Sequence, residues 1–200
     1  IYDPVISCKK INQLKKHEVK YDNYFVSIGR LTKQKNLFLL LNAFKDLYNE
    51  NFLDEKLIII GEGELKKKIE LFINSNNLNK KILLLGYKKN VYKYLYYAKA
   101  LVLTSLWEDP GFVLIEAAYC RTSLISSDCK SGPLEFLENK NNGYLFKSNS
   151  KSDLKQKILE FKNTDVKNIK TKKFNALKES NKFSFIKHFI KLNNLLNLKN

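Results

Sequence analysis

Residues 24–29 read YFVSIG, a continuous apolar run that ends at a glycine, and residues 57–61 repeat the pattern as LIIIG. Three further apolar runs follow at residues 82–85, 100–104 and 123–126. Each run is continuous rather than alternating, which is the pattern of strands buried on both faces of a sheet. These segments therefore predict five buried strands.

Helical periodicity separates the predicted strands. Apolar residues recur at spacings of three and four across residues 37–48, and Asn36 is placed to cap that helix. Similar patterns cover residues 65–72, 91–98 and 111–119. Strict alternation of strand and helix predicts an α/β fold with a doubly wound, Rossmann-like parallel sheet. Because ligands of such sheets bind beyond the carboxyl ends of the strands, the turns after the strands are where functional residues are expected.

Size and composition narrow the class of protein. The 200 residues suffice for one well-buried domain, and a chain that starts at Ile1 and contains no methionine is expected to be part of a longer protein. No apolar run approaches the roughly 20 residues that cross a bilayer, and no signal-peptide pattern opens the chain. We therefore expect a cytoplasmic protein whose three cysteines, Cys8, Cys120 and Cys129, are reduced thiols.

Charge is the second constraint. The formal net charge is +16, which predicts an anionic partner: a nucleic acid, a phosphorylated ligand or an acidic membrane surface. Residues 151–200 hold 13 lysines against 4 acidic residues and show only helical patterns. Such amphipathic, lysine-rich helices suit an anionic membrane surface. A solvated outer face that packs on a part of the protein outside this chain explains them equally well.

The first candidate site follows the first predicted strand, in the segment GRLTKQKN (residues 29–36). Arg30 and Lys35 flank a short loop that opens a helix. The planar fork of an arginine and the compact cation of a lysine could together clamp a pyrophosphate. Two solvated cations in a lysine-rich protein are the alternative interpretation.

The second candidate site is WEDPGFVLIEA (residues 107–117), in which Glu108 and Glu116 are separated by seven residues. Pro110 and Gly111 end a turn and begin a helix, whose first amides offer an anion site. The carboxylates would suit hydroxyl groups, as on a sugar ring or a ribose diol. Otherwise Glu108 is an exposed turn residue and Glu116 a surface helix residue. Trp107 is expected to lie in the core under the turn, with stacking on a ligand as the alternative.

The segment GEGE (residues 61–64) forms another strand-to-helix turn. It lacks the third glycine of a dinucleotide-binding fingerprint, because Lys66 stands three residues after Gly63. It is interpreted as a tight turn that a ligand approaches closely, or simply as a turn.

Taken in order, these motifs resemble the C-terminal, donor-binding domain of family 4 (group 1) retaining glycosyltransferases, one half of the two-domain GT-B architecture. The resemblance rests on an ordered set of segments: SIGRL, IIGEGEL, LLGY, TSLWEDPGFVLIEA, SSDCKSGPLE and NGYLF. It implies a nucleotide-sugar-binding domain over residues 1–162, with residues 163–200 as a basic helical extension packed on it. The acceptor-binding N-terminal half lies outside this chain, so we expect it to bind donor but not to catalyse transfer alone.

The resemblance also implies roles for individual residues. Arg30 and Lys35 would hold the donor diphosphate and neutralise charge on the departing nucleotide. Glu108 would face the hydroxyls of the transferred sugar, so that these three residues carry the catalysis, and Glu116 would bind the ribose diol. The remaining donor-binding positions are the backbone at Gly29, the base contacts at Gly86 and Tyr87, and the helix-start amides of Gly111, Phe112 and Val113.

The resulting hypothesis is transfer of a hexose or N-acetylhexosamine, from a UDP-sugar, to a lipid-linked or glycan acceptor in surface polysaccharide biosynthesis. The family implies that the reaction needs no metal and no cofactor, and a location in the cytoplasm or at the inner face of the membrane. Two alternatives stay open. One is a basic nucleic-acid-binding module, which only the net charge supports. The other is a non-catalytic nucleotide-binding relative of the same fold.

Overall fold

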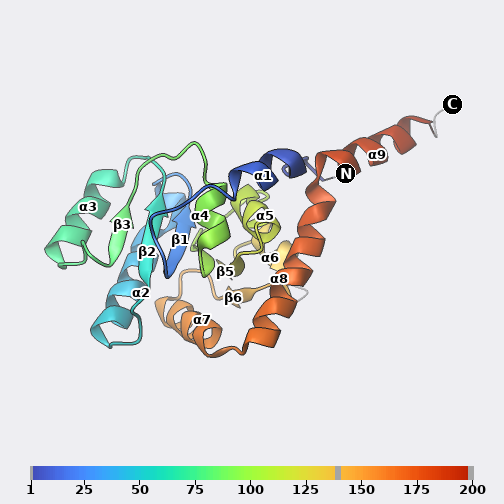
Figure 1. Ribbon diagram of the computed structural model, residues 1–200. Helices are drawn as coiled ribbons and strands as arrows, with labels where there is room; N and C mark the ends of the chain where they lie inside the picture. The colour runs from blue at the N-terminus through green and yellow to red at the C-terminus, as the bar shows by residue number, and fades with distance from the viewer. Residues whose placement is uncertain (1, 138–140, 198–200) are drawn as a thin grey trace.

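The computed structural model describes residues 2–137 and 141–197, and within them six strands form one parallel sheet (Figure 1). The strands are β1 (Tyr24–Ile28), β2 (Lys56–Ile60), β3 (Ile82–Leu84), β4 (Ala100–Leu103), β5 (Ser123–Ser127) and β6 (Tyr144–Phe146). Their order across the sheet is β3-β2-β1-β4-β5-β6. The predicted α/β fold with a doubly wound parallel sheet is confirmed, and every residue of β1 is buried, as its continuous apolar run indicates.

Helices cover both faces of this sheet (Figure 1). They are α1 (Cys8–Leu14), α2 (Leu37–Asn49), α3 (Lys66–Ser75), α4 (Tyr92–Tyr97), α5 (Phe112–Tyr119), α6 (Pro133–Leu137), α7 (Lys151–Asn163), α8 (Val166–Ser180) and α9 (Phe185–Asn197). The described residues also contain two 3-10 turns, η1 (Lys33–Lys35) and η2 (Asn181–Phe183). One apolar core lies between the sheet and α2, α3 and α7, and a second between the sheet and α1, α4, α5, α6 and α8.

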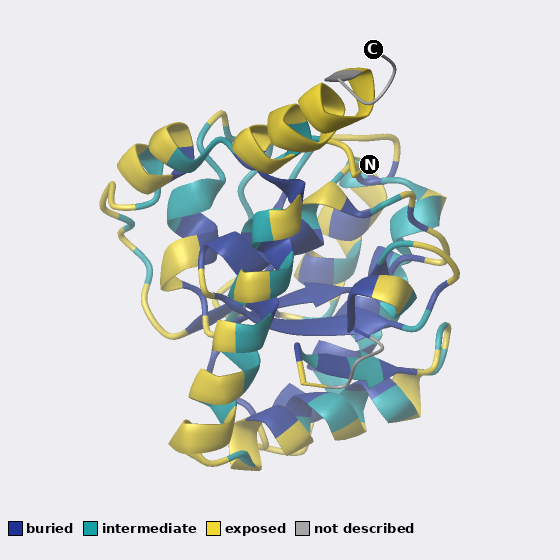
Figure 2. Ribbon diagram, turned by 90° about the vertical axis from the view of Figure 1, so that its right-hand side faces the viewer, coloured by how far each residue is buried: buried dark blue, intermediate teal, exposed yellow. Residues whose placement is uncertain are grey.

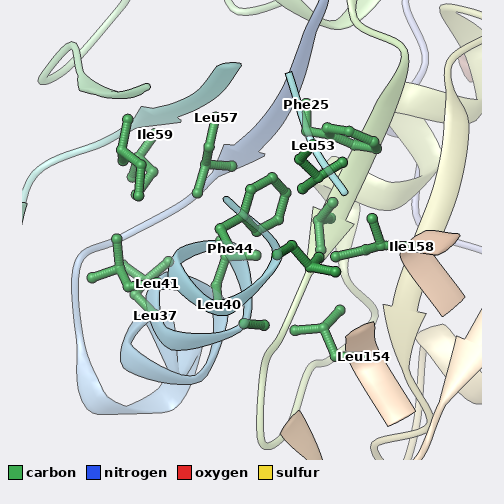
Figure 3. Packing of buried hydrophobic residues seen from close by; sticks show 14 of the residues in the cluster. Phe25, Leu37, Leu40, Leu41, Phe44, Leu53, Leu57, Ile59, Leu154 and Ile158 are labelled. Carbon is green, nitrogen blue, oxygen red and sulfur yellow. The ribbon is translucent and has the colours of Figure 1, made fainter. Parts of the chain in front are cut away.

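The first core shows how the strand and helix patterns meet. Phe25 of β1 contacts Phe44 of α2 edge to face, with ring centroids 5.5 Å apart (Figure 3). Ile158 of α7 belongs to the same cluster. Neighbouring residues of a strand point to opposite faces, so Val26 enters the second core instead. Each face of the sheet is therefore covered by an apolar core.

Helix α2 begins one residue after Asn36, as predicted, but Asn36 does not cap it in the expected way. Its backbone is left-handed, with φ of 48°, and its side chain makes no capping hydrogen bond. The side-chain amide donates instead to Asn149 Oδ1 at 3.1 Å. The left-handed residue ends η1 and turns the chain into α2, so a conformational requirement explains the asparagine.

The C-terminal part of the chain is helical, apart from the short strand β6, which the sequence patterns missed. Helix α7 packs on α2, and α8 packs on α5 through buried Ala176. A backbone bridge joins Ile6 to Ser184. Helix α9 then projects from the body of the molecule (Figure 1). No helix in the described parts of the chain is long and apolar enough to cross a membrane.

The strand order reverses between β1 and β4. Strands β2 and β3 lie on one side of β1, and β5 and β6 lie on the far side of β4. The loops after β1 and β4 therefore diverge from one point at the carboxyl edge of the sheet, which is where open α/β sheets bind their ligands.

Candidate functional site

The loops that follow β1 and β4 are joined by hydrogen bonds at this switch point. Thr104 Oγ1 donates to the carbonyl of Lys35 at 2.8 Å, and the Leu106 amide donates to the carbonyl of Gln34 at 2.9 Å. The Gln34 side-chain amide donates to the carbonyl of Trp107 at 2.9 Å. The two loops predicted as separate candidate sites thus form one structural unit.

Lys35 and Glu108 form an ion pair at the centre of this unit. The Lys35 ammonium donates to Glu108 Oε1, and the side chains are only 14% and 7% exposed. Ser105 Oγ donates to the same carboxylate oxygen, and Ser127 Oγ on β5 donates to the Ser105 carbonyl at 2.6 Å. The interpretation of Glu108 as an exposed turn residue is therefore wrong. Sequence reasoning missed both serines: Ser127, because no spacing in the sequence connects β5 to this loop, and Ser105, because a serine three residues before Glu108 has no signal of its own.

Arg30, in contrast to the mostly buried Lys35, lies at the surface. Its side chain is exposed, with one hydrogen bond from Nη2 to Gln34 Oε1 at 3.4 Å. Gly29 lies beneath Lys35: a Cβ atom at Gly29 would come within 3.1 Å of Lys35 Cε. The structure therefore brings Gly29, Arg30, Lys35 and Glu108 together, with Arg30 as the cation that faces solvent.

An open pocket of about 340 Å³ adjoins Arg30 beyond the carboxyl ends of β1 and β2. It is lined by Ile28, Gly29, Arg30, Ile60, Gly61, Glu62, Tyr87, Lys88 and Val91. Tyr87, one of the predicted base-contact positions, is 71% exposed. Gly86 does not line the pocket; its left-handed φ of 66° turns the chain from β3 so that Tyr87 does. Volume and lining suit a small ligand with one aromatic and one cationic contact.

Glu116 lies on α5 and accepts a hydrogen bond from the Tyr92 hydroxyl at 3.0 Å. Burial raises the pKa of its carboxyl, although the hydrogen bond from Tyr92 opposes that shift. Tyr92 directly follows Val91, a wall of the pocket. Glu116 is therefore half-buried beside α4, and the surface-residue alternative is wrong. Tyr92 is a further residue that sequence reasoning did not assign to the site.

Gly111 is the N-cap of helix α5, and its φ of 80° is left-handed. The first amides of a helix have no partner within it, so those of Phe112 and Val113 are suited to an anion or a hydroxyl group. Phe112 is 46% exposed. Trp107 is 56% exposed, so its predicted place in the core under the turn is wrong.

The GEGE turn has a structural explanation. A Cβ atom at Gly61 would lie 1.9 Å from the carbonyl oxygen of Gly29, and one at Gly63 would lie 2.6 Å from that of Leu31. The Leu31 amide also donates to the carbonyl of Glu62 at 2.9 Å. The close approach that these glycines permit is therefore made by the chain's own backbone, and it fixes the loop that carries Arg30.

Two smaller expectations concern cysteines and metals. Cys8, Cys120 and Cys129 are free thiols, and burial raises the pKa of Cys120 to about 12. In the part of the chain that the structure describes, no three His, Cys, Asp or Glu side chains gather where they could hold a metal ion. Metal-independent chemistry stays a prediction.

Comparison with known proteins places this site in a family. The model of the family described as glycosyl transferases, group 1, matches residues 9–182. The chain therefore belongs to the group 1 glycosyltransferases, and the resemblance drawn from its sequence motifs is confirmed.

Two relatives and one solved structure show what the chain is similar to. It is 33% identical over 157 residues to a Staphylococcus aureus poly(ribitol-phosphate) alpha-N-acetylglucosaminyltransferase, covering 78% of this chain and 31% of the relative. A Campylobacter jejuni N-acetylgalactosamine-N,N'-diacetylbacillosaminyl-diphospho-undecaprenol 4-alpha-N-acetylgalactosaminyltransferase is 36% identical over 135 residues, with coverages of 68% and 36%. The chain thus spans about a third of the length of these relatives.

The structure of TarM superposes with a TM-score of 0.76 at 30% identity, covering 92% of this chain and 37% of TarM. A variant of S. aureus TarM has been solved in complex with Fondaparinux, alpha-GlcNAc-glycerol and UDP. By their names, the two relatives act on a polymer and on a lipid-linked acceptor, respectively. The expected correspondence to one half of a GT-B glycosyltransferase is confirmed by these matches.

Proposed function

We propose that this chain is the donor-binding half of a retaining glycosyltransferase that takes a hexose or N-acetylhexosamine from a UDP-sugar. The observation that carries the proposal is the junction of the β1 and β4 loops, where Arg30, Lys35 and Glu108 meet beside the 340 Å³ pocket. Two cations and a carboxylate are the groups that a diphosphate joined to a sugar requires. Family membership supplies the class of reaction.

The donor would lie along the carboxyl edge of the sheet. The uracil base contacts the exposed ring of Tyr87, and the ribose diol donates to Glu116 next to Tyr92. The diphosphate lies between Arg30 and the first amides of α5. The positions of Arg30 and Tyr87 on one pocket support this arrangement. The solved complex of a TarM variant with UDP supports the choice of nucleotide.

The proposed chemistry breaks the bond between the sugar C1 atom and the diphosphate oxygen, and forms a bond from C1 to an acceptor hydroxyl on the same face. The acceptor proton passes to the departing UDP oxygen, so the anomeric configuration is retained. Arg30 and Lys35 stabilise the negative charge that develops on that oxygen, and Glu108 orients the sugar hydroxyls. No metal takes part in this scheme.

The acceptor would be lipid-linked or a glycan, and a part of the protein outside this chain would bind it. The names of the two relatives support this class of acceptor. Helix α9 adds a reason to place the protein at a membrane. It is exposed along most of its length (Figure 2), and its large apolar residues are accessible to solvent. They are Phe185, Ile186, Phe189, Ile190, Leu192, Leu195 and Leu196.

Lys187 and Lys191 lie on the same helix among these apolar residues. An amphipathic helix with lysines on its polar side suits the interface of an anionic bilayer, where each basic residue contributes about 1 kcal/mol of attraction. We therefore keep peripheral attachment to the inner face of the membrane as part of the proposal.

Calorimetric titration with UDP tests the donor site directly. We expect saturable binding that Arg30→Ala weakens by about tenfold or more, because a hydrogen bond between charged groups is lost. Lys33→Ala is the matched control, since Lys33 is an exposed cation two residues before Lys35. Absence of saturable binding, or equal losses in the two variants, would contradict the proposal.

The two alternative functions need their own controls. A single-stranded RNA oligomer titrated at rising salt tests the nucleic-acid alternative, for which we expect only weak binding that does not depend on Arg30. Hydrolysis of a UDP-sugar by the complete protein distinguishes an active transferase from a non-catalytic relative. A complete protein that binds UDP but never releases sugar would favour the latter.

A further inference from the structure

A second pocket lies at the opposite edge of the sheet from the donor site. Glu55 immediately precedes β2 and Lys99 immediately precedes β4, so both mark the amino ends of parallel strands. Phe161 and Lys162 near the end of α7 contribute one wall of the pocket, and α8 contributes another. The pocket has a volume of about 300 Å³ and is lined by Glu55, Lys99, Phe161, Lys162, Ile169 and Lys173.

The charges in this pocket do not balance. Glu55 is buried and accepts hydrogen bonds from Lys99 Nζ at 2.7 Å and from Lys162 Nζ at 3.2 Å. Burial favours the neutral acid, but the hydrogen bonds from the two lysines outweigh it and lower the pKa of Glu55. The lining thus holds one carboxylate and three lysines: Lys99 and Lys162 pair with Glu55, and Lys173 does not. The excess is two positive charges.

Lys173 is the informative member of the group. Its side chain is partly buried, and burial lowers its pKa with no carboxylate among the described residues to offset the loss of hydration. A partly desolvated cation without a counter-charge is unfavourable unless an anion joins it. Ile169 lies one helical turn before Lys173 on α8, so the cation stands beside an apolar surface.

The apolar part of the pocket is well defined. The Phe161 ring packs edge to face against Phe25 and Tyr144, with centroids 5.8 and 5.7 Å away. Phe161 is buried in the first core, with 6% of it exposed, and together with Ile169 it forms the apolar part of the lining next to the three lysines. The pocket therefore combines an excess of two positive charges with a surface suited to a ring or a short hydrocarbon.

We propose that this pocket binds a small phosphate monoester, with the phosphate among Lys99, Lys162 and Lys173 and the apolar body on Phe161 and Ile169. A phosphate monoester carries nearly two negative charges at neutral pH, which matches the excess. The pocket volume lies at the lower end of the range for small-molecule sites. Because the pocket opens at the amino edge of the sheet, such a ligand would bind without competing for the donor site.

Titration calorimetry with phenyl phosphate tests the proposal. We expect saturable binding, with inorganic phosphate and phenol each binding more weakly because each supplies only half of the contacts. Lys173→Ala should weaken phenyl phosphate by about tenfold or more, the effect of losing one charged hydrogen bond. Lys170→Ala is the matched control, because Lys170 is an exposed lysine on the same helix.

Other outcomes would overturn the proposal. One is a titration with phenyl phosphate whose heat does not saturate. Another is that sodium chloride of equal ionic strength gives the same heat. Another is a loss of affinity that Lys170→Ala matches. Arg30→Ala should leave the phenyl phosphate affinity unchanged; if it abolishes binding, the ligand occupies the donor site instead. Lys173→Ala should fold normally because no ion pair is broken, and urea unfolding of each variant checks this.

Discussion

Lys35 and Glu108, 73 residues apart in the sequence, form an ion pair that joins the loops after β1 and β4. The pair holds together the two segments that carry the candidate site, and Ser105 Oγ donates to the same carboxylate oxygen. A diphosphate bound next to Lys35 would compete with Glu108 for the same ammonium. Donor binding would then free the carboxylate to accept hydroxyl groups of the sugar.

Removing one partner of this pair should be costly. Lys35→Ala is expected to lower the free energy of unfolding by about 3–5 kcal/mol, because it leaves a buried carboxylate without its counter-charge. Urea unfolding measures the change. Adding Glu108→Gln to Lys35→Ala should recover part of the loss, since a neutral amide is less costly to bury. If Lys35→Ala lowers the free energy of unfolding no more than Lys33→Ala does, the ion pair does not hold the two loops together.

Ser105 is expected to act through Glu108 as a positioning residue. In the complete enzyme, Ser105→Ala should lower kcat by about tenfold, because one hydrogen bond to a charged group is lost, with little change in the KM for the UDP-sugar. Ser105→Thr keeps the hydroxyl and should restore most of the rate. A purely structural role predicts instead that kcat follows the thermal stability of the variants, which circular dichroism would reveal.

The raised pKa of Glu116 gives a pH-dependent prediction. Burial raises the pKa of this carboxyl above its ordinary value of 4.5, so the folded protein holds the proton more tightly than the unfolded chain. The free energy of unfolding should therefore fall as the pH rises from about 4.5 through the folded pKa. Glu116→Gln removes this contribution. Its stability relative to the wild type should increase over that window, measured by urea unfolding at several pH values; a constant difference would show that Glu116 ionises normally.

Much of the fold follows from patterns that are local in the sequence. The runs before Gly29 and Gly61 predict buried strands because every residue in them is apolar or small, and helix α5 is marked by Pro110 and Gly111. Strands β3 and β6 both have three residues, but the apolar run of β3 continues through Leu85, whereas that of β6 is bounded by Gly143 and Lys147 and is too short to recognise. Fold prediction therefore fails where an apolar run is short or, as at Asn36, where one residue type satisfies two different local structures.

The sequence predicted which charged residues belong to the site, but not which of them contact one another. Arg30, Lys35 and Glu108 stand out by type and motif, whereas the pairing of Lys35 with Glu108 depends on how two distant loops meet. The supporting hydroxyls of Ser105 and Tyr92 have no sequence signal of their own. Residue type alone also misleads at Trp107, which was expected in the core but lies at the surface.

The packing of Gly61 against Gly29 predicts a strong effect of one methyl group. A Cβ atom at position 61 would lie 1.9 Å from the Gly29 carbonyl oxygen, so Gly61→Ala must push the β1 loop away. We expect a loss of about 1–3 kcal/mol in the free energy of unfolding, as for other overpacked sites, and weaker UDP binding because Arg30 moves.

Gly143→Ala is the control for this effect. Gly143 immediately precedes β6, at the amino edge of the sheet, and a Cβ atom there would lie 2.7 Å from the Leu124 carbonyl oxygen. The loss of stability should again be about 1–3 kcal/mol. Thermal unfolding and UDP titration of both variants separate the two effects: UDP affinity should fall in Gly61→Ala and stay near the wild-type value in Gly143→Ala. Equal affinities would show that the Gly61 contact does not position Arg30.

The exposed face of α9 predicts attachment to anionic vesicles. The protein should sediment with vesicles that contain phosphatidylglycerol and not with pure phosphatidylcholine, and salt should weaken the binding because lysines contribute to it. Phe189→Glu places a charge on the apolar face and should abolish sedimentation. Phe174→Glu is a closely matched control, because Phe174 lies on α8 and both phenylalanines are 65% exposed. If the two variants sediment equally, or if the complete protein does not bind anionic vesicles, α9 does not bind a membrane. Its apolar face would then be covered by protein.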